Sequence, residues 1–330
     1  MKIIIPVAGA GTMLRPHTYT QPKPLIPLAG KTIISHIIDQ FVELGQHEFI
    51  FVIGYLGEKI KNYILEKHPE INAKFVVQEE RLGTGHAIFL AKEFVEKNEE
   101  IFIIYGDTII DYPIKEIIDN PISQIGVKKV DDPRMFGVAI LNEHKKLVQL
   151  VEKPTIPKSN LALVGVYKII ESEALFEVIE NDLKKVSKHE EYPLTAAFQG
   201  LLNKNISIEV FEVNDWFDCG KKENLLITNA ILLDKLEYAS SEIPFFDNTI
   251  IVHPVSIAEG CDISNSIIGP HVSIGEKTVI SNSIISNSII GSYSEIEKIV
   301  FQSSLIGSDA KIKGNNQSLN IGDNTEIDLR

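Results

Sequence analysis

Short apolar runs alternate with longer amphipathic segments over about the first 230 residues. The runs are rich in β-branched side chains, which is typical of buried strands. They are KIIIPVA (2–8), FIFVIG (49–54), KFVVQ (74–78) and IFIIYGD (101–107). Between them, segments 31–45 and 84–97 repeat apolar residues at helical spacing, and Gly45 gives the first a suitable stop. The pattern predicts an α/β fold with a doubly wound, mostly parallel, Rossmann-like sheet.

In such a sheet, ligands bind beyond the carboxyl ends of the strands. The glycine-rich loop that follows the first run and the Gly106-Asp107 pair that follows the fourth both occupy such ends. We therefore expect the functional site where these two segments meet.

A different periodicity begins after about residue 245. Isoleucine or valine recurs every six residues within successive sets, and the first members of the sets are 17, 16 and 16 residues apart. The sets are 251/257/263, 268/274/280, 284/290/296, 300/306/312 and 321/327. With Gly, Ser, Asn and Asp between the apolar positions, three short strands per coil predict a hexapeptide parallel β-helix of about five coils. The predicted domains are residues 1–236 and 249–330, with residues 237–248 as a linker.

Composition limits the partners. The 330 residues include 32 Lys and Arg against 45 Asp and Glu, a net charge of −13, which argues against nucleic acid and anionic membranes as partners. An anionic ligand must then be met by a local basic cluster. Two cysteines are too few for a disulfide framework, and the N-terminus resembles neither a signal peptide nor a membrane span, so a cytoplasmic location is expected.

The first loop, GAGTMLRPHTYTQPKPLIPLAGK (9–31), narrowly misses two familiar phosphate-binding motifs. A Walker A loop would need glycine at Leu25, and a dinucleotide-binding fingerprint would need glycine at Leu14. What is left is a glycine turn with exposed backbone N–H groups, followed by Arg15 and Lys23, which suits a polyphosphate. On these residues alone, an ordinary strand-to-helix turn with solvated basic side chains fits equally well.

The loop resembles the signature of sugar-1-phosphate nucleotidyltransferases, approximately G-x-G-T-R-L-R-P-x-T followed by P-K-P-L. Further segments occur in that family's order: VVQEERLGTGHA (76–87), YGDTI (105–109), FGVAIL (136–141), LVEKP (150–154), LVGVYKI (163–169) and WFDCG (216–220). The chain resembles glucose-1-phosphate thymidylyl- and uridylyltransferases, and its segment 76–87 resembles especially the base loop of N-acetylglucosamine-1-phosphate uridylyltransferases, so an amino or N-acetyl sugar stays open as the acceptor. Many family members carry a C-terminal left-handed β-helix. The resemblance covers essentially the whole chain.

The resemblance implies a transfer of a nucleotidyl group from dTTP or UTP to a sugar 1-phosphate, with glucose 1-phosphate as the default acceptor. It also implies Mg²⁺ as cofactor and a homo-oligomer. The residues that it assigns are Arg15, Lys23, Asp107 and Lys153 for catalysis; Gly9, Gly11, Thr12, Gln78, Gly83 and Thr84 for the nucleotide; Gly137, Glu152, Lys153 and Gly165 for the sugar phosphate; and Asp107 and Asp218 for the metal. GTP, as used by mannose-1-phosphate guanylyltransferases, is the alternative nucleotide.

Met13 departs from the family pattern, which has arginine at this position. A thioether carries no charge and donates no hydrogen bond. Three interpretations stay open: a working enzyme with altered phosphate contacts, in which Arg15 partly substitutes; a weak paralogue that binds sugar nucleotides and regulates a partner; or a substitution peculiar to this chain. In the repeat region, an acetyl-transfer site is an alternative to a stacking or oligomerisation module, although His253 and His271 are the only histidines there.

Overall fold

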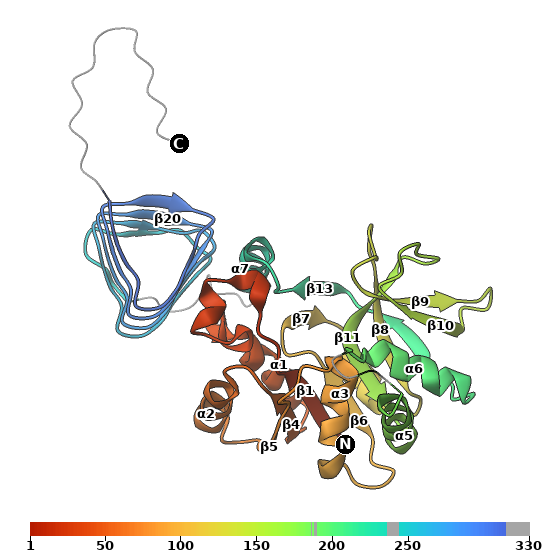
Figure 1. The fold of residues 1–330 in the computed structure, drawn as a ribbon. Coiled ribbons are helices and arrows are strands. Elements are labelled where there is room, and N and C mark those ends of the chain that lie inside the picture. Colours follow the sequence, from red (N-terminus) through yellow and green to blue (C-terminus); the bar gives the residue numbers. More distant parts are fainter. Residues whose placement is uncertain (186, 188–189, 236–243, 315–330) are drawn as a thin grey trace. The chain divides into compact units, whose positions relative to one another are not determined.

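The computed structural model describes residues 1–185, 187, 190–235 and 244–314 of the chain. The chain divides into two compact units, Met1–Thr228 and Asn229–Arg330, and the division falls inside the helix α7 (Lys222–Lys235). The sheet of the first unit and the stacked strands of the second are drawn in Figure 1.

The first unit is built on a nine-stranded sheet whose central path runs β10-β9-β11-β6-β1-β4-β5. The strands β6 (Ile101–Ile104), β1 (Lys2–Val7), β4 (Glu48–Ile53) and β5 (Asn72–Val77) pair in parallel, as their apolar runs predict. The remaining strands of this sheet are β8 (Gln124–Lys129), β9 (Gly137–Leu141), β10 (Leu147–Glu152), β11 (Leu161–Ile169) and β12 (Glu209–Glu212). β11 pairs antiparallel with β6, β8 and β9, so the sheet is mixed.

Helices cover both faces of the sheet. On one face, Ile4, Ile50 and Ile103 share an apolar core with α3 (Gly83–Leu90), α5 (Ser172–Leu183) and α6 (Leu194–Asn203). On the other face, Phe41 of α1 (Ile33–Val42) meets the rings of Phe49 and Phe102 edge to face. This arrangement confirms the doubly wound Rossmann-like class. Two further helices, α2 (Gly57–Lys67) and α4 (Ile114–Asp119), and the two-stranded pairs β2 (Pro27–Leu28) with β3 (Lys31–Thr32) and β7 (Thr108–Asp111) with β13 (Asp215–Asp218) complete the unit.

The helix predicted over 84–97 is shorter than its apolar pattern. α3 ends at Leu90, and the chain continues as one 3₁₀ segment, Ala91–Phe94. Ala87 and Ala91 are buried as expected. The apolar spacing therefore located the buried face correctly but did not specify the change in helix type.

The second unit contains three four-stranded parallel sheets that together form four coils of a left-handed β-helix (Figure 1). The strands are β14 (Ile250–Ile251), β15 (Val255–Ile257), β16 (Asp262–Ser264), β17 (Ile267–Ile268), β18 (Val272–Ile274), β19 (Val279–Ser281), β20 (Ile284–Ser286), β21 (Ser288–Ile290), β22 (Glu295–Glu297), β23 (Val300–Gln302), β24 (Leu305–Ile306) and β25 (Lys311–Lys313). The predicted fifth set, 321/327, lies outside the described residues.

The predicted inward positions are wrong in two coils. Ile284 and Val300 are 45% and 72% exposed, whereas their neighbours Ile285 and Phe301 pack toward the core of the β-helix. Ile268 pairs with Ile285, which in turn pairs with Phe301. A single residue, Asn287, separates β20 from β21, so this corner is short and the inner positions are five residues apart there instead of six.

Candidate active site

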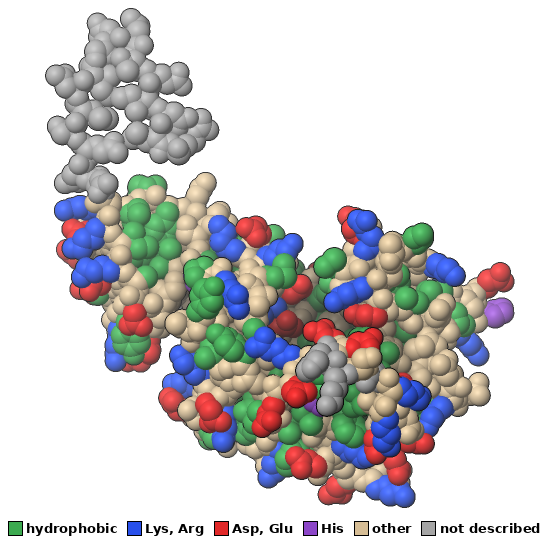
Figure 2. Space-filling view, in the orientation of Figure 1, with side chains coloured by type: hydrophobic (Ala, Val, Ile, Leu, Met, Phe, Trp, Pro, Cys, Tyr) green, Lys and Arg blue, Asp and Glu red, His purple; other side chains and the backbone are tan. Residues whose placement is uncertain are grey.

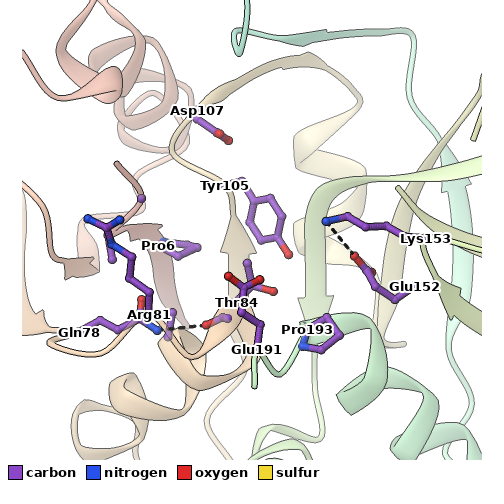
Figure 3. Close-up of a pocket in the computed structure, with 14 residues that line it drawn as sticks. Pro6, Gln78, Arg81, Thr84, Tyr105, Asp107, Glu152, Lys153, Glu191 and Pro193 are labelled. Carbon is purple, nitrogen blue, oxygen red and sulfur yellow. Dashed lines mark hydrogen bonds and ion pairs between the residues drawn. The ribbon is translucent and has the colours of Figure 1, made fainter. Parts of the chain in front are cut away.

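A cavity of about 520 Å³ opens at the carboxyl end of β1. This is where the strand order reverses, because β4 and then β5 lie on one side of β1 and β6 lies on the other. Open α/β sheets bind ligands at such a switch point. The lining residues are Pro6, Ala8, Gly9, Gln78, Arg81, Gly83, Thr84, Ala87, Tyr105, Asp107, Glu152, Lys153, Glu191 and Pro193, most of them drawn in Figure 3. A smaller cavity of about 80 Å³, lined in part by Gly11 and Lys23, shares Gly9 and Asp107 with it.

Lys23 joins two of the predicted acidic residues. Its Nζ atom lies 2.7 Å from Oδ2 of Asp107 and 3.5 Å from Oδ1 of Asp218. Burial by itself lowers the pKa of the Lys23 ammonium, but the attraction of the two carboxylates outweighs this, and the pKa stands above its ordinary value. The lysine is therefore a fixed cation at neutral pH.

The two carboxylates also fit a divalent cation. Asp107 follows β6, and Asp218 ends β13, which pairs with β7 directly after Asp107. Both side chains are nearly half exposed, at 45% and 46%, so oxygens of a ligand can reach them. Mg²⁺ is commonly held by one or two carboxylates together with substrate phosphates and water. No group of three or more His, Cys, Asp or Glu in the described part of the chain could hold a metal ion, so a metal here would need those additional oxygens.

Within residues 9–15, the first loop reaches the cavities only through its glycines. Gly9 lines both cavities, and Gly11, whose φ is +61°, lines the smaller one. Thr12 and Met13 form a single 3₁₀ turn with Leu14 and line neither cavity. Arg15 also lies outside the described linings, and its guanidinium stacks on the ring of Tyr19 at 4.9 Å. The geometry thus brings Gly9, Gly11 and Lys23 together but not Thr12 or Arg15.

The predicted base-reading loop lines one side of the larger cavity. Gln78 is buried, and its Nε2 donates to the carbonyl of Gly83 at 3.1 Å and lies 3.0 Å from Nδ1 of His86. The amide nitrogen therefore braces the loop, and the Oε1 atom is the part of the amide suited to a ligand. Gly83 has a φ of +90°, and a Cβ atom there would lie 2.5 Å from the carbonyl oxygen of Tyr192. Thr84 accepts a hydrogen bond from the backbone N–H of Leu194.

Glu152 and Lys153 line the opposite side, as Figure 3 shows. The Oε2 atom of Glu152 accepts a 2.6 Å hydrogen bond from Thr195, and Lys153 Nζ lies 4.0 Å from Oε1. Gly137 lies against the hydrogen-bonded side chains of Glu152 and Thr195. A Cβ atom at Gly137 would lie 2.7 Å from Oγ1 of Thr195 and 3.1 Å from Oε2 of Glu152. The Lys153 backbone has a φ of +42° and donates to the carbonyl of Phe136.

Gly165 has a supporting position behind the cavity. Its φ is +85°, and a Cβ atom there would lie 2.7 Å from the ring of Tyr105. Tyr105 itself lines the cavity, and burial raises the pKa of its hydroxyl to about 12, so the hydroxyl is neutral and can donate a hydrogen bond. Gly165 therefore leaves room for the Tyr105 ring.

Seven lining residues were not predicted as site residues from the sequence: Pro6, Ala8, Arg81, Ala87, Tyr105, Glu191 and Pro193. Arg81 and Tyr105 lie within the recognised segments 76–87 and 105–109, so their positions in those motifs could have indicated a place in the site. Glu191 and Pro193 follow no motif. They reach the cavity because Tyr192 pairs with the predicted base loop: its N–H donates to Leu82, and its carbonyl accepts from Gly85.

The C-terminal unit contains a histidine–carboxylate pair. His271 Nε2 lies 3.1 Å from Oδ1 of Asp234 of α7, and the His271 side chain is 30% exposed. The backbone carbonyl of His271 also accepts a hydrogen bond from Asn229. The imidazole is thus tied to the helix, and no cavity accompanies it among those described above.

A protein-family model described as nucleotidyl transferase matches residues 2–235. The bifunctional protein GlmU of Methanocaldococcus jannaschii is 37% identical over 261 residues, which are 79% of this chain and 61% of that protein. A bifunctional sugar-1-phosphate nucleotidylyltransferase/acetyltransferase of Sulfurisphaera tokodaii is 33% identical over 269 residues, 80% of this chain and 64% of that protein. The chain therefore spans about three fifths of the length of these curated relatives.

The fold also matches a solved structure. A Bacillus anthracis protein described as a glucose-1-phosphate thymidylyltransferase superposes with a TM-score of 0.62 at 24% identity, covering 74% of this chain and 98% of that one. In addition, no described helix is both long and apolar enough to cross a membrane.

Proposed function

Since this chain belongs to the nucleotidyl transferase family, we propose that it transfers a nucleotidyl group from dTTP or UTP to a sugar 1-phosphate, with glucose 1-phosphate as the default acceptor. The observation that carries the proposal is one cavity with two unlike sides. Gly9, Gln78 and Gly83 line the side for the nucleotide, and Glu152 and Lys153 line the side for the sugar phosphate. Asp107 lies in the same lining, where the two substrates would meet.

The reaction needs positioning more than covalent chemistry. A phosphate oxygen of the sugar 1-phosphate attacks the α-phosphorus of the triphosphate, a new P–O bond forms, and the bond to pyrophosphate breaks opposite to it. No general base is needed, because the attacking oxygen is already ionised near pH 7. Lys153 neutralises the acceptor phosphate, and Glu152, held by Thr195, orients the sugar hydroxyls. Lys23 stabilises negative charge next to the reacting centre.

The nucleotide is held by backbone and amide groups. The glycine turn at Gly9 and Gly11 presents N–H groups to the phosphates. Gln78 accepts a hydrogen bond from the base through Oε1, since its nitrogen already bonds within the loop. Asp107 and Asp218 would hold Mg²⁺, which when bound neutralises charge on the α-phosphate and on the leaving group.

We further propose residues 1–236 as the catalytic domain, 237–248 as a linker and 249–330 as a stacking module of a homo-oligomer. The name of the Sulfurisphaera tokodaii relative includes acetyl transfer. Acetyl transfer is a less favoured function for this chain, because His271 is held by Asp234 and Asn229 and lines none of the cavities described above.

The test is pyrophosphate release with Mg²⁺ from UTP, dTTP, GTP, CTP and ATP, each with a panel of sugar 1-phosphates, for the wild-type chain and for Met13→Arg. We expect release with UTP or dTTP. Preference for GTP would support a guanylyltransferase instead. Release only from Met13→Arg would mean a transferase scaffold disabled at one contact. Silence from both proteins, with binding of sugar nucleotides, would replace the proposal with a regulatory binder.

A further inference from the structure

We propose that Arg81 is the cation that binds the nucleotide phosphates in this chain, in place of the arginine that Met13 replaces. The inference rests on the proposed function and adds a residue that no motif assigns to the site. It starts from a deficit: a triphosphate carries several negative charges, and cations near the glycine loop are few.

Neither of the two loop positions considered for this role, 13 and 15, lines the cavities described above. Met13 is 67% exposed on the 3₁₀ turn and carries no charge. Arg15 stacks on Tyr19. For Arg15 to serve the phosphates, the 3₁₀ turn and its stacking contact would have to rearrange.

Lys23 is near the glycine loop but is already committed. Its ammonium lies between Asp107 and Asp218, at 2.7 and 3.5 Å. Two carboxylates around one ammonium leave the cluster with a net negative charge. Part of the Lys23 charge therefore balances the acidic pair, so Lys23 alone does not supply all the positive charge that a triphosphate beside the glycine loop needs.

Arg81 is an exposed residue beside the start of the glycine loop. Its guanidinium lies over the ring of Tyr55, 5.8 Å from the centroid, and the Tyr55 backbone N–H donates to the carbonyl of Ala8. Arg81, Ala8 and Gly9 line the same cavity. Figure 3 shows Arg81 on one side of the cavity and Lys153 on the other, with Tyr105 between them. The cavity thus has one cation for each phosphate-bearing substrate.

Arg81 is also free to bind an anion. In the part of the chain that the structure describes, no carboxylate lies within ion-pair distance of its guanidinium. Two acidic side chains of the lining, in contrast, have partners: Glu152 accepts from Thr195, and Asp107 pairs with Lys23. A planar guanidinium that is already oriented by an aromatic ring suits bidentate binding of phosphate oxygens.

The test measures binding by calorimetry, with UTP and uridine and with dTTP and thymidine as probes, in wild type and in Arg81→Gln. We expect the affinity for the triphosphate to fall about 10- to 100-fold, as for a lost hydrogen bond to a charged group. The affinity for the nucleoside should stay unchanged. Arg134→Gln is the matched control, since Arg134 is exposed and pairs with Asp132 away from the cavity.

The double variant Met13→Arg, Arg81→Gln tests whether the two positions do the same task. We expect it to recover at least tenfold of the lost triphosphate affinity, because position 13 is exposed, it follows Gly11 of the smaller cavity by two residues, and an arginine side chain is long and charged. A double variant no better than Arg81→Gln would overturn the exchange of roles. A loss in Arg15→Gln with none in Arg81→Gln would overturn the whole inference and assign the role to Arg15.

The two proposals fail in different ways. A wild-type chain that binds no triphosphate and releases no pyrophosphate removes the proposed function and this inference with it. A wild-type chain that is active, and whose Arg81→Gln variant binds and turns over equally well, removes the inference alone.

Discussion

Buried polar side chains have different partners in the first unit and in the coils of the second. Lys23, 8% exposed, bonds to carboxylates 84 and 195 residues away in the sequence. In the described coils, the buried polar side chains are all serine or threonine. Ser283, for example, donates to the carbonyl of Ser281 and accepts from the N–H of Ile299, one coil further on.

The difference distinguishes polar groups that bind a ligand from polar groups that only stabilise the fold. Hydroxyl groups that bond the backbone of their own or the next coil satisfy a repeating frame and leave nothing for a ligand. A buried charge with distant, half-exposed partners leaves oxygens that a ligand can reach. Burial of charge alone is not sufficient, because the Lys168 ammonium is capped by the carbonyls of Ile118 and Asn120 and lies outside the cavity lining.

Asp107→Asn tests whether the carboxylates around Lys23 serve catalysis, and we expect it to have the largest effect of the three substitutions. The neutral amide no longer balances Lys23 and cannot bind Mg²⁺ as a carboxylate does. We expect pyrophosphate release to fall by about 10²- to 10³-fold or more, while circular dichroism stays that of the wild type. Asp132→Asn, an exposed carboxylate paired with Arg134, is the control and should keep full turnover. Turnover by Asp107→Asn equal to that of the control would refute the assignment.

Ile285→Ala tests which isoleucine of β20 packs in the core of the β-helix. Ile285 is fully buried, so its truncation should lower the free energy of unfolding by about 2–5 kcal/mol. Ile284→Ala, at the 45% exposed neighbouring position, should cost less than about 0.5 kcal/mol. Hydrogen exchange of peptides from the coils, followed by mass spectrometry, would measure both. Equal protection in the two variants, or a larger loss in Ile284→Ala, would contradict the observed register.

The pH dependence of stability should show a smaller effect at Lys23. Because the folded protein holds the pKa of Lys23 above its unfolded value of 10.5, the stabilisation is complete below that pH and is lost as pH rises through the folded pKa. Urea unfolding between pH 9 and 12 should therefore show a steeper decline in wild type than in Lys23→Met. Lys115→Met, at an exposed position, controls for the general effect of alkali. Parallel curves for wild type and Lys23→Met would count against the buried ion pair.

Much of the molecule follows from the sequence alone. The apolar runs specified β1, β4 and β6, because a strand buried on both faces needs continuous β-branched residues. The shorter run KFVVQ also located β5, which is partly exposed at the edge of the sheet. The six-residue spacing specified a stacked β-helix, because no coil can bury its apolar edge alone. Placing the glycine loop and Asp107 at strand ends also indicated that they would meet.

Only the tertiary structure determined the register of β20 and the directions of the arginine side chains near the cavity. A corner that is shortened to Asn287 moved the inner position from Ile284 to Ile285, and an average spacing does not record the loss of one residue at a single corner. The direction of Arg15 depends on Tyr19, which ends the 3₁₀ turn His17–Tyr19. The direction of Arg81 depends on Tyr55, which is 26 residues earlier in the chain. Loop side chains follow no fixed period, so only the packing of their neighbours determines which cation faces the cavity.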